Sequence, residues 1–329
     1  MEASVAPRGP CMSVALQGGG ALGAFTMVVI DGLLSSGVRI GAASGASSGA
    51  LNAVLLADGL ARGGADEARK RMAAFWNHMS RLSLAGRMMG SGMRTAMQMM
   101  GMAEYSPSPY SSNPFRINPL RDAVGDHVDF SRLSRSGIPL FISATRVLDG
   151  QPRIFTGAEV TLDAIMASTC LPRLQSAVEI GGDAYWDGGY TSNPPLMPLV
   201  HSGIGRDILL VQLTADRVPV VPMTSEAIKN HLADMPFHEG LLREVSMFRS
   251  MRALAIDGHL VAGEMSARLS QARLSRIMLS DHTQKLVSDP TDASSAAIMT
   301  LSTAGRLLGT RFAQDRFASP EFMDAPVLQ

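Results

Sequence analysis

"VALQGGGALGAF", residues 14–25, joins two apolar stretches through a glycine-rich turn. Gly18, Gly20 and Gly23 form the pattern Gly-x-Gly-x-x-Gly, with which dinucleotide-binding turns begin. The apolar stretch before the glycines is predicted to be a buried strand, and the one after them a helix. The turn between the two elements therefore offers backbone N–H groups to a negatively charged partner.

A dinucleotide is a poor match for this turn. Such a site needs an acidic residue about 20 positions further on, at the end of the second strand, to hold the ribose hydroxyls. Residues 38–49, "VRIGAASGASSG", contain no acid, and Asp31 lies inside the predicted helix. The chain carries "GASSG", residues 45–49, where that acid would stand.

"GASSG" is a Gly-x-Ser-x-Gly motif, again placed between a predicted strand and a predicted helix. A serine on such a sharp turn needs small neighbours, which Gly45 and Gly49 supply, and the turn lifts the Ser47 hydroxyl above the sheet. Acyl transfer to a serine creates an oxyanion that fixed N–H donors stabilise. The expected donors are the backbone N–H groups of Gly18, Gly19, Gly20 and Ser48.

A nucleophilic serine also needs a base to accept its proton. Of seven histidines, only His201 has a loop context that suits this role, and most of the others fall in predicted helices or polar turns. Asp187 in "AYWDGGYTSNPP", residues 184–195, closes a predicted strand, and Gly188-Gly189 after it allow a tight turn. An ordinary hairpin turn accounts for this stretch equally well when it is taken alone.

The three motifs, in this order, resemble those of the patatin-like phospholipase family. "ASTCLP" (167–172), "YWDGGYTSNPPLMPL" (185–199) and the helical stretch around "LLREVSMFRSMRALA" (241–255) are similar to bacterial members as well. The resemblance covers residues 12–315 and implies a Ser-Asp dyad with no catalytic histidine. It makes Ser47 the nucleophile and Asp187 the proton acceptor. Leu22 departs from the family, since many members have Arg or Lys there.

The motifs are also compatible with two different functions. One is that of an ordinary Ser-His-Asp α/β-hydrolase esterase, with His201 or His282 as the base. The second is that of a catalytically silent scaffold that binds lipid with the same fold. The presence of both Ser47 and Asp187 argues against a silent scaffold, which needs neither residue.

The composition of the chain limits the classes of binding partner that are expected. Lys and Arg together number 29, as do Asp and Glu, so the net charge is zero and nucleic acid is not an expected partner. Cys11 and Cys170 are expected to be free thiols, and no His/Cys cluster has the spacing of zinc ligands, so neither a metal nor a cofactor is expected.

The expected partner is a phospholipid or another acyl ester, with peripheral contact to a membrane. With no signal-like start and no apolar run of membrane-spanning length, a cytoplasmic location is expected.

Strands that alternate with helices predict an α/β fold of three layers (α/β/α), with a mostly parallel central sheet and C-terminal helices. Residues 12–315 are predicted to form one acyl hydrolase domain, mostly helical from residue 224, between tails at 1–11 and 316–329. Residues 104–119 carry four prolines and are predicted to be an extended loop.

Two segments have more than one interpretation. Residues 86–102 hold seven of the 22 methionines and four glycines, which suits either a core helix or a mobile lid over an acyl chain. Residues 241–255 place apolar residues on one face and arginines largely elsewhere. That helix is expected to pack on the core, and contact with an anionic membrane is the alternative.

Overall fold

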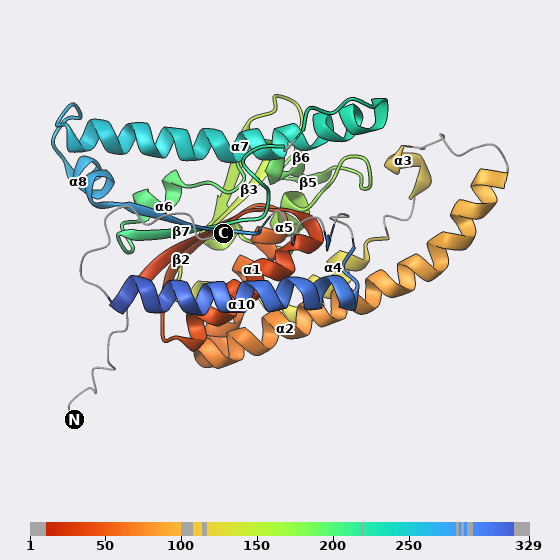
Figure 1. Cartoon of the computed structure of the whole chain (residues 1–329), viewed down its shortest axis with the longest axis horizontal. Helices are drawn as coiled ribbons and strands as arrows, with labels where there is room; N and C mark the ends of the chain where they lie inside the picture. The colour runs from red at the N-terminus through yellow and green to blue at the C-terminus, as the bar shows by residue number, and fades with distance from the viewer. Residues whose placement is uncertain are drawn as a thin grey trace.

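A computed structural model describes residues 11–99, 108–113, 117–218, 220–280, 283, 286–287 and 292–318; side chains 84–99 lie outside the description. A mixed, mostly parallel sheet forms its centre (Figure 1), with strand order β5-β6-β3-β2-β1-β7-β8 and β4 paired to β3. The strands are β1 (Cys11–Leu16), β2 (Arg39–Gly45), β3 (Leu140–Arg146), β4 (Pro152–Thr156), β5 (Val178–Ile180), β6 (Asp183–Asp187), β7 (Asp207–Gln212) and β8 (Arg273–Met278).

Helices cover both faces of the sheet, which confirms the predicted three-layer α/β/α fold. In Figure 1, α7 with α6 and α8 lies on one side of the strands, and α1, α2 and α10 lie on the other. The α-helices are α1 (Gly23–Ser35), α2 (Ser48–Met99), α3 (Pro109–Ser112), α4 (Pro119–His127), α5 (Leu162–Ser168), α6 (Met197–Ser202), α7 (Ser225–Ile256), α8 (Glu264–Gln271) and α10 (Ser295–Ala318).

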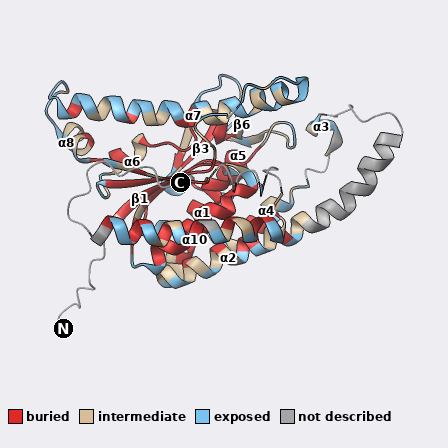
Figure 2. Ribbon diagram, viewed as in Figure 1, coloured by how far each residue is buried: buried red, intermediate tan, exposed pale blue. Residues whose placement is uncertain are grey.

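The inner parallel strands β1 and β7 bury both of their faces, as strands covered by helices on two sides do. In β1, Val14 and Leu16 pack in the core layer that contains α1, α2 and α10, whereas Ala15 packs in the layer under α7. Figure 2 shows the result, with the sheet and α1 buried and the outer surface of α7 exposed. The strands are therefore rigid supports for the turns that follow them.

Helix α1 lies in the middle of its layer and is buried from Gly23 to Leu34. Close contact with α10 depends on glycine, because a Cβ on Gly309 would lie 2.3 Å from the Val29 carbonyl oxygen. The one acid of α1, Asp31, forms ion pairs with Arg69 at 2.6 Å and Arg306 at 2.9 Å. The charge that interrupts the apolar run is thus neutralised by the two neighbouring helices.

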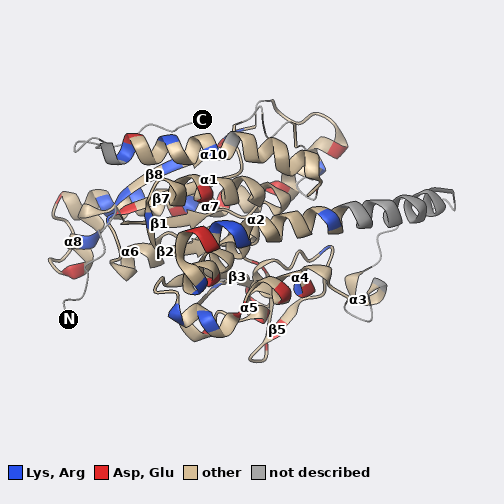
Figure 3. Cartoon of the chain, turned by 90° about the horizontal axis from the view of Figure 1, so that it is seen from below, with Lys and Arg blue, Asp and Glu red and all other residues tan. Residues whose placement is uncertain are grey.

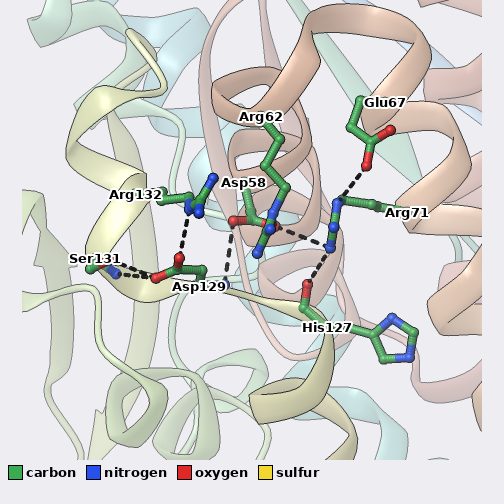
Figure 4. A network of polar contacts seen from close by, with 8 residues as sticks. All are labelled: Asp58, Arg62, Glu67, Arg71, His127, Asp129, Ser131 and Arg132. Carbon is green, nitrogen blue, oxygen red and sulfur yellow. Dashed lines mark hydrogen bonds and ion pairs between the residues drawn. The ribbon is translucent and has the colours of Figure 1, made fainter.

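Helix α2 changes direction at Gly63-Gly64, where the backbone leaves helical geometry. A polar network spans this kink (Figure 4). The buried carboxylate of Asp58 binds Arg62 Nε at 2.7 Å before the kink and forms an ion pair with Arg71 at 3.7 Å after it. Asp58 also accepts a hydrogen bond from the backbone N–H of Asp129 at 3.3 Å, so the network ties α2 to the segment after α4.

Three segments that the sequence analysis singled out have different outcomes in the structure. The loop predicted at 104–119 contains the short helix α3, because Pro109 occupies its first turn and Ser108 caps it. Of residues 86–102, the backbone is helical as far as Met99, and the side chains that would distinguish a lid from a core helix lie outside the described residues. The helix at 241–255 packs its apolar face on the sheet, as expected: Leu241, Phe248 and Ala255 are buried there.

Candidate active site

Ser47 occupies the turn between β2 and α2. Its φ of 52° is the one positive value among the non-glycine residues that the structure describes. The turn leaves no room for larger neighbours, because a Cβ on Gly49 would lie 2.0 Å from the Leu16 carbonyl oxygen and one on Gly45 2.5 Å from the Gly49 backbone. Ser168 Oγ accepts the backbone N–H of Ser47 at 3.0 Å and holds the strained residue in place. This is the geometry of a serine on a nucleophile elbow.

Asp187 reaches the same place through the pairing of β3. Strand β4 pairs with β3 from Phe141 to Thr145, so it occupies one edge along that length. Along the other edge, Gly45 at the end of β2 pairs with Ile142, and Asp187 at the end of β6 pairs with Ala144. Because β6 runs antiparallel, the carboxyl ends of β2 and β6 face each other along this edge. The residues that follow β2 therefore meet the residue that ends β6.

The Asp187 carboxyl group is fully buried. Its Oδ1 accepts the Gly189 N–H at 2.7 Å, and its Oδ2 makes no hydrogen bond of normal geometry with any described group. Burial raises the pKa of Asp187 to about 7. Hydrogen bonds from the Gly189 amide and the Ser47 hydroxyl favour the ionised form and lower the pKa, but by less than burial raises it. Gly188 is required beside it, since a Cβ there would lie 2.1 Å from the Ser143 carbonyl oxygen.

The first glycine motif borders Ser47, as a Cβ on Gly18 would lie 2.7 Å from the Ser47 Cβ. Two of the four expected oxyanion donors are already bonded: the Gly18 N–H donates to Asn193 Oδ1 at 2.7 Å, and the Gly19 N–H to Ser48 Oγ at 3.0 Å. The N–H groups of Gly20 and Ser48 make no hydrogen bond within the described part of the chain. Gly23 begins α1, and a Cβ there would lie 2.7 Å from the Ser48 Cβ.

The chain after Asp187 is held by α7. Asn193 accepts the Gly18 amide with its oxygen and donates through Nδ2 to the Phe237 carbonyl at 3.1 Å. Glu244 accepts the Ser192 hydroxyl at 2.6 Å and the Leu196 N–H at 3.0 Å. These bonds connect the first glycine loop, the turn of the third motif and α7 in one partly buried unit.

Three residues that support the site, Ser168, Asn193 and Glu244, were not predicted as site residues from the motifs. Ser168 and Asn193 fall inside stretches that resemble the family, and the adjacent "TCLP" and "PP" are the available signals. Glu244 lies in a helix whose charge pattern looks like an ordinary solvated face. Only the fold brings its carboxylate onto the 192–196 loop.

No histidine within the described residues hydrogen-bonds to Ser47 or Asp187. His201 lies exposed on α6, and His282 is outside the description. Cys170 packs beside Asp187, which donates its backbone N–H to the Cys170 carbonyl at 2.8 Å. Burial and the neighbouring carboxylate raise the pKa of the Cys170 thiol to about 12, so the thiol stays protonated at neutral pH. Cys11 and Cys170 are both free, as expected.

Metal-binding clusters and membrane-spanning helices are both absent from the described residues. These residues contain no group of three or more His, Cys, Asp or Glu side chains arranged to hold a metal ion. Among the same residues, no helix combines the length and the apolar character needed to cross a membrane.

Comparison with known proteins identifies the family. The family model described as patatin-like phospholipase matches residues 14–200, which include all three motifs. The chain belongs to the patatin-like phospholipase family. Membership supports lipid hydrolysis as its general activity. No protein with a curated description matches the chain.

Several solved structures are similar to this family member over most of its length. VipD from Legionella pneumophila has 14% identity and a TM-score of 0.39, covering 89% of this chain and 67% of its own. The type III effector protein ExoU has 16% identity and a TM-score of 0.35, covering 93% of this chain. The chain thus spans about half of that ExoU chain, 53%. A complex of full-length SpcU with full-length ExoU from Pseudomonas aeruginosa matches at 14% identity and a TM-score of 0.29, covering 94% of this chain and 77% of that one.

Proposed function

We propose that this protein hydrolyses acyl esters of lipids, as a phospholipase A or lysophospholipase-type esterase, with a dyad of Ser47 and Asp187. The observation that carries the proposal is the meeting of a strained serine with a fully buried carboxyl group whose pKa is about 7. A carboxylate with its ordinary pKa is a weak base, whereas one that titrates near neutrality is suited to accept and return a proton.

In the proposed reaction, Ser47 Oγ attacks the ester carbonyl carbon while its proton passes to Asp187. The tetrahedral intermediate collapses, the bond to the lipid alcohol breaks, and the alcohol leaves with the proton from Asp187. Water then attacks the acyl-enzyme and gives a proton to Asp187. The fatty acid departs, and Ser47 regains its hydroxyl proton, so the protein ends unchanged.

The oxyanion is proposed to bind to the N–H groups of Gly20 and Ser48, which make no hydrogen bond with any described group. Ser48 is the first residue of α2, so the positive end of a helix dipole lies beside the reacting carbonyl. The Gly19 N–H becomes a third donor if the Ser48 hydroxyl rotates away from it. Gly18 has a different role in this proposal, because its N–H is bonded to Asn193 and its lack of a side chain leaves space for Ser47.

The substrate is proposed to be a phospholipid or a related acyl ester at a membrane surface. The family description supports a phospholipid, and Ser47 itself is nearly buried, so the ester bond must leave the bilayer to reach it. Residence in the cytoplasm stays a prediction from the sequence.

Hydrolysis of a soluble p-nitrophenyl ester tests the dyad. Ser47→Ala should abolish turnover and labelling by a fluorophosphonate probe, because removal of a nucleophile costs about 10⁴-fold or more in kcat. Asp187→Asn should be nearly as inactive. Asp183→Asn is the matched control, since this residue is half-exposed on the same strand and should keep wild-type turnover.

The same assay separates the dyad from a triad. All seven His→Gln variants are expected to remain active, because no described histidine contacts either dyad residue. A single folded His→Gln variant with about a thousandfold loss of kcat would refute the dyad and favour a Ser-His-Asp triad. Wild-type protein that neither turns over esters nor reacts with the probe would instead support the silent lipid-binding scaffold.

A further inference from the structure

A cavity lies where the edge strand β8 meets the C-terminal half of α7 and the end of α10. Its volume is about 430 Å³, within the range of about 300–1,000 Å³ that is typical of small-molecule sites. Five arginines line it, which sets it apart from an ordinary apolar crevice; we call it the arginine cavity. They are Arg249 and Arg252 from α7, Arg273 and Arg276 from β8, and Arg316 from α10.

The carboxylates near the arginine cavity neutralise only some of this charge. Asp207 forms ion pairs with Arg273, at 2.9 Å, and with Arg316. Asp216 pairs with Arg276 at 2.8 Å. Arg249 and Arg252 have no ion pair with any carboxylate of the described residues, not even with Asp257 on the cavity wall.

The guanidinium group of Arg252 is fixed by one hydrogen bond from its Nε. Its Nε donates to the Ala272 carbonyl oxygen at 2.7 Å, and its two terminal nitrogens carry no other hydrogen bond within the described part of the molecule. Arg249 precedes it by three residues and therefore lies on the same face of α7. Like charges at this spacing repel each other, and an anion bound between them removes that repulsion. A phosphate group suits two such guanidinium groups because each can bind it through two N–H donors.

The arginine cavity is separate from the dyad in the fold. Strands β1 and β7 stand between β2, which Ser47 follows, and β8, so three strand spacings, about 14 Å, separate the two strands. Figure 3 shows basic residues on β8 and at the neighbouring end of α10. None of the residues that line the cavity belongs to the three motifs.

We propose that the arginine cavity binds a ligand that carries phosphate, separately from the acyl ester that Ser47 attacks. The shared chemistry is a compact group with two or more negative charges. Two sources supply it: the phosphorylated headgroup of a lipid, or a soluble phosphate compound. The site is independent of the proposed hydrolysis and persists in the inactive Ser47→Ala variant.

Binding to the full-length Ser47→Ala protein tests the proposal without turnover. One probe is inorganic pyrophosphate, measured by titration calorimetry. The other is a phosphatidylcholine vesicle containing phosphatidylinositol 4-phosphate, measured by co-sedimentation against vesicles that contain phosphatidylserine at matched charge. Arg249→Gln with Arg252→Gln should weaken the binding by about tenfold or more, since both lost contacts are charge-assisted. Arg243→Gln is the control, because Arg243 is exposed on the same helix and does not line the cavity.

The two probes distinguish the sources. Binding of pyrophosphate that the double variant loses supports a soluble phosphate ligand, and binding confined to the phosphoinositide vesicles supports a lipid headgroup. No binding of either probe, equal binding by the double variant, or equal binding to the phosphatidylserine vesicles would overturn the proposal. If the double variant unfolds, Arg249→Gln alone gives the answer, because Arg249 is exposed and has no hydrogen bond or ion pair with any described residue.

Discussion

Replacing Asp187 with asparagine should make the protein inactive and, at neutral or higher pH, more stable. Asparagine has nearly the same shape and can still accept the Gly189 N–H through its Oδ1. It carries no charge at any pH, so the folded protein no longer has to bury an ionised group. The change therefore isolates the cost of the buried carboxylate.

The pKa of Asp187 sets the size of the effect. Below pH 3.8 the carboxyl group is protonated in both the folded and the unfolded chain, so its burial costs little. Between pH 3.8 and about 7 the unfolded chain loses this proton while the folded protein keeps it, so the wild type loses stability as pH rises. The loss is about 1.4 kcal/mol per pH unit over this window and reaches about 4 kcal/mol, above which it is constant.

Urea unfolding of the wild type and of Asp187→Asn, followed by circular dichroism from pH 4 to pH 8.5, measures this difference. The stability gained by the variant should be small at pH 4, grow steadily, and level off above pH 7 at about 4 kcal/mol or less. The control is Asp183→Asn on the same strand. Asp183 is half-exposed, so its replacement should change the free energy of unfolding by about 0.5 kcal/mol or less.

A pH-independent difference between the wild type and Asp187→Asn would refute the reasoning. It would mean that the carboxyl group loses its proton equally easily in both states, and that burial does not raise its pKa. A variant that loses stability relative to the wild type between pH 4 and pH 8 would also refute it, and would mean that the ionised carboxylate helps to hold the turn.

Three other results are expected. The kcat/KM of the wild type should rise with pH through about 7 and then level, because Asp187 must be ionised to act as the base; a flat profile would contradict this. Asp58→Ala should cost about 1 to 3 kcal/mol in urea unfolding, because it removes the buried acceptor of Arg62, Arg71 and the Asp129 N–H, whereas exposed Asp66→Ala should cost about 0.5 kcal/mol or less. Gly18→Ala places a Cβ 2.7 Å from that of Ser47, so it should lower kcat about 100-fold on a soluble ester; unchanged kcat would show that the turn has room.

Local sequence was enough to predict most elements of the fold. The strands expected before the first glycine motif, before "GASSG" and up to Asp187 are β1, β2 and β6 of the structure. Apolar runs of strand length, bounded by glycines and polar turns, carry this information within a few residues. The long helix α2 was harder to predict as one element, because its two halves meet at Gly63-Gly64, a glycine pair typical of a helix end. Asp58 before the kink pairs with Arg71 after it, and it also accepts the backbone N–H of Asp129, 71 positions further along the chain.

By itself, the sequence determined that a small-residue turn follows each of the first two strands, and that an Asp-Gly-Gly turn follows a later one. These are local facts, because small residues and Asp-Gly pairs favour sharp turns wherever they occur in a chain. The tertiary structure decided which turns meet. β2 and β6 are far apart in the chain, and only their shared register along one edge of β3 brings Ser47 to Asp187. Burial at that junction then sets the pKa of the carboxyl group, because desolvation depends on every element packed around it and on no single motif.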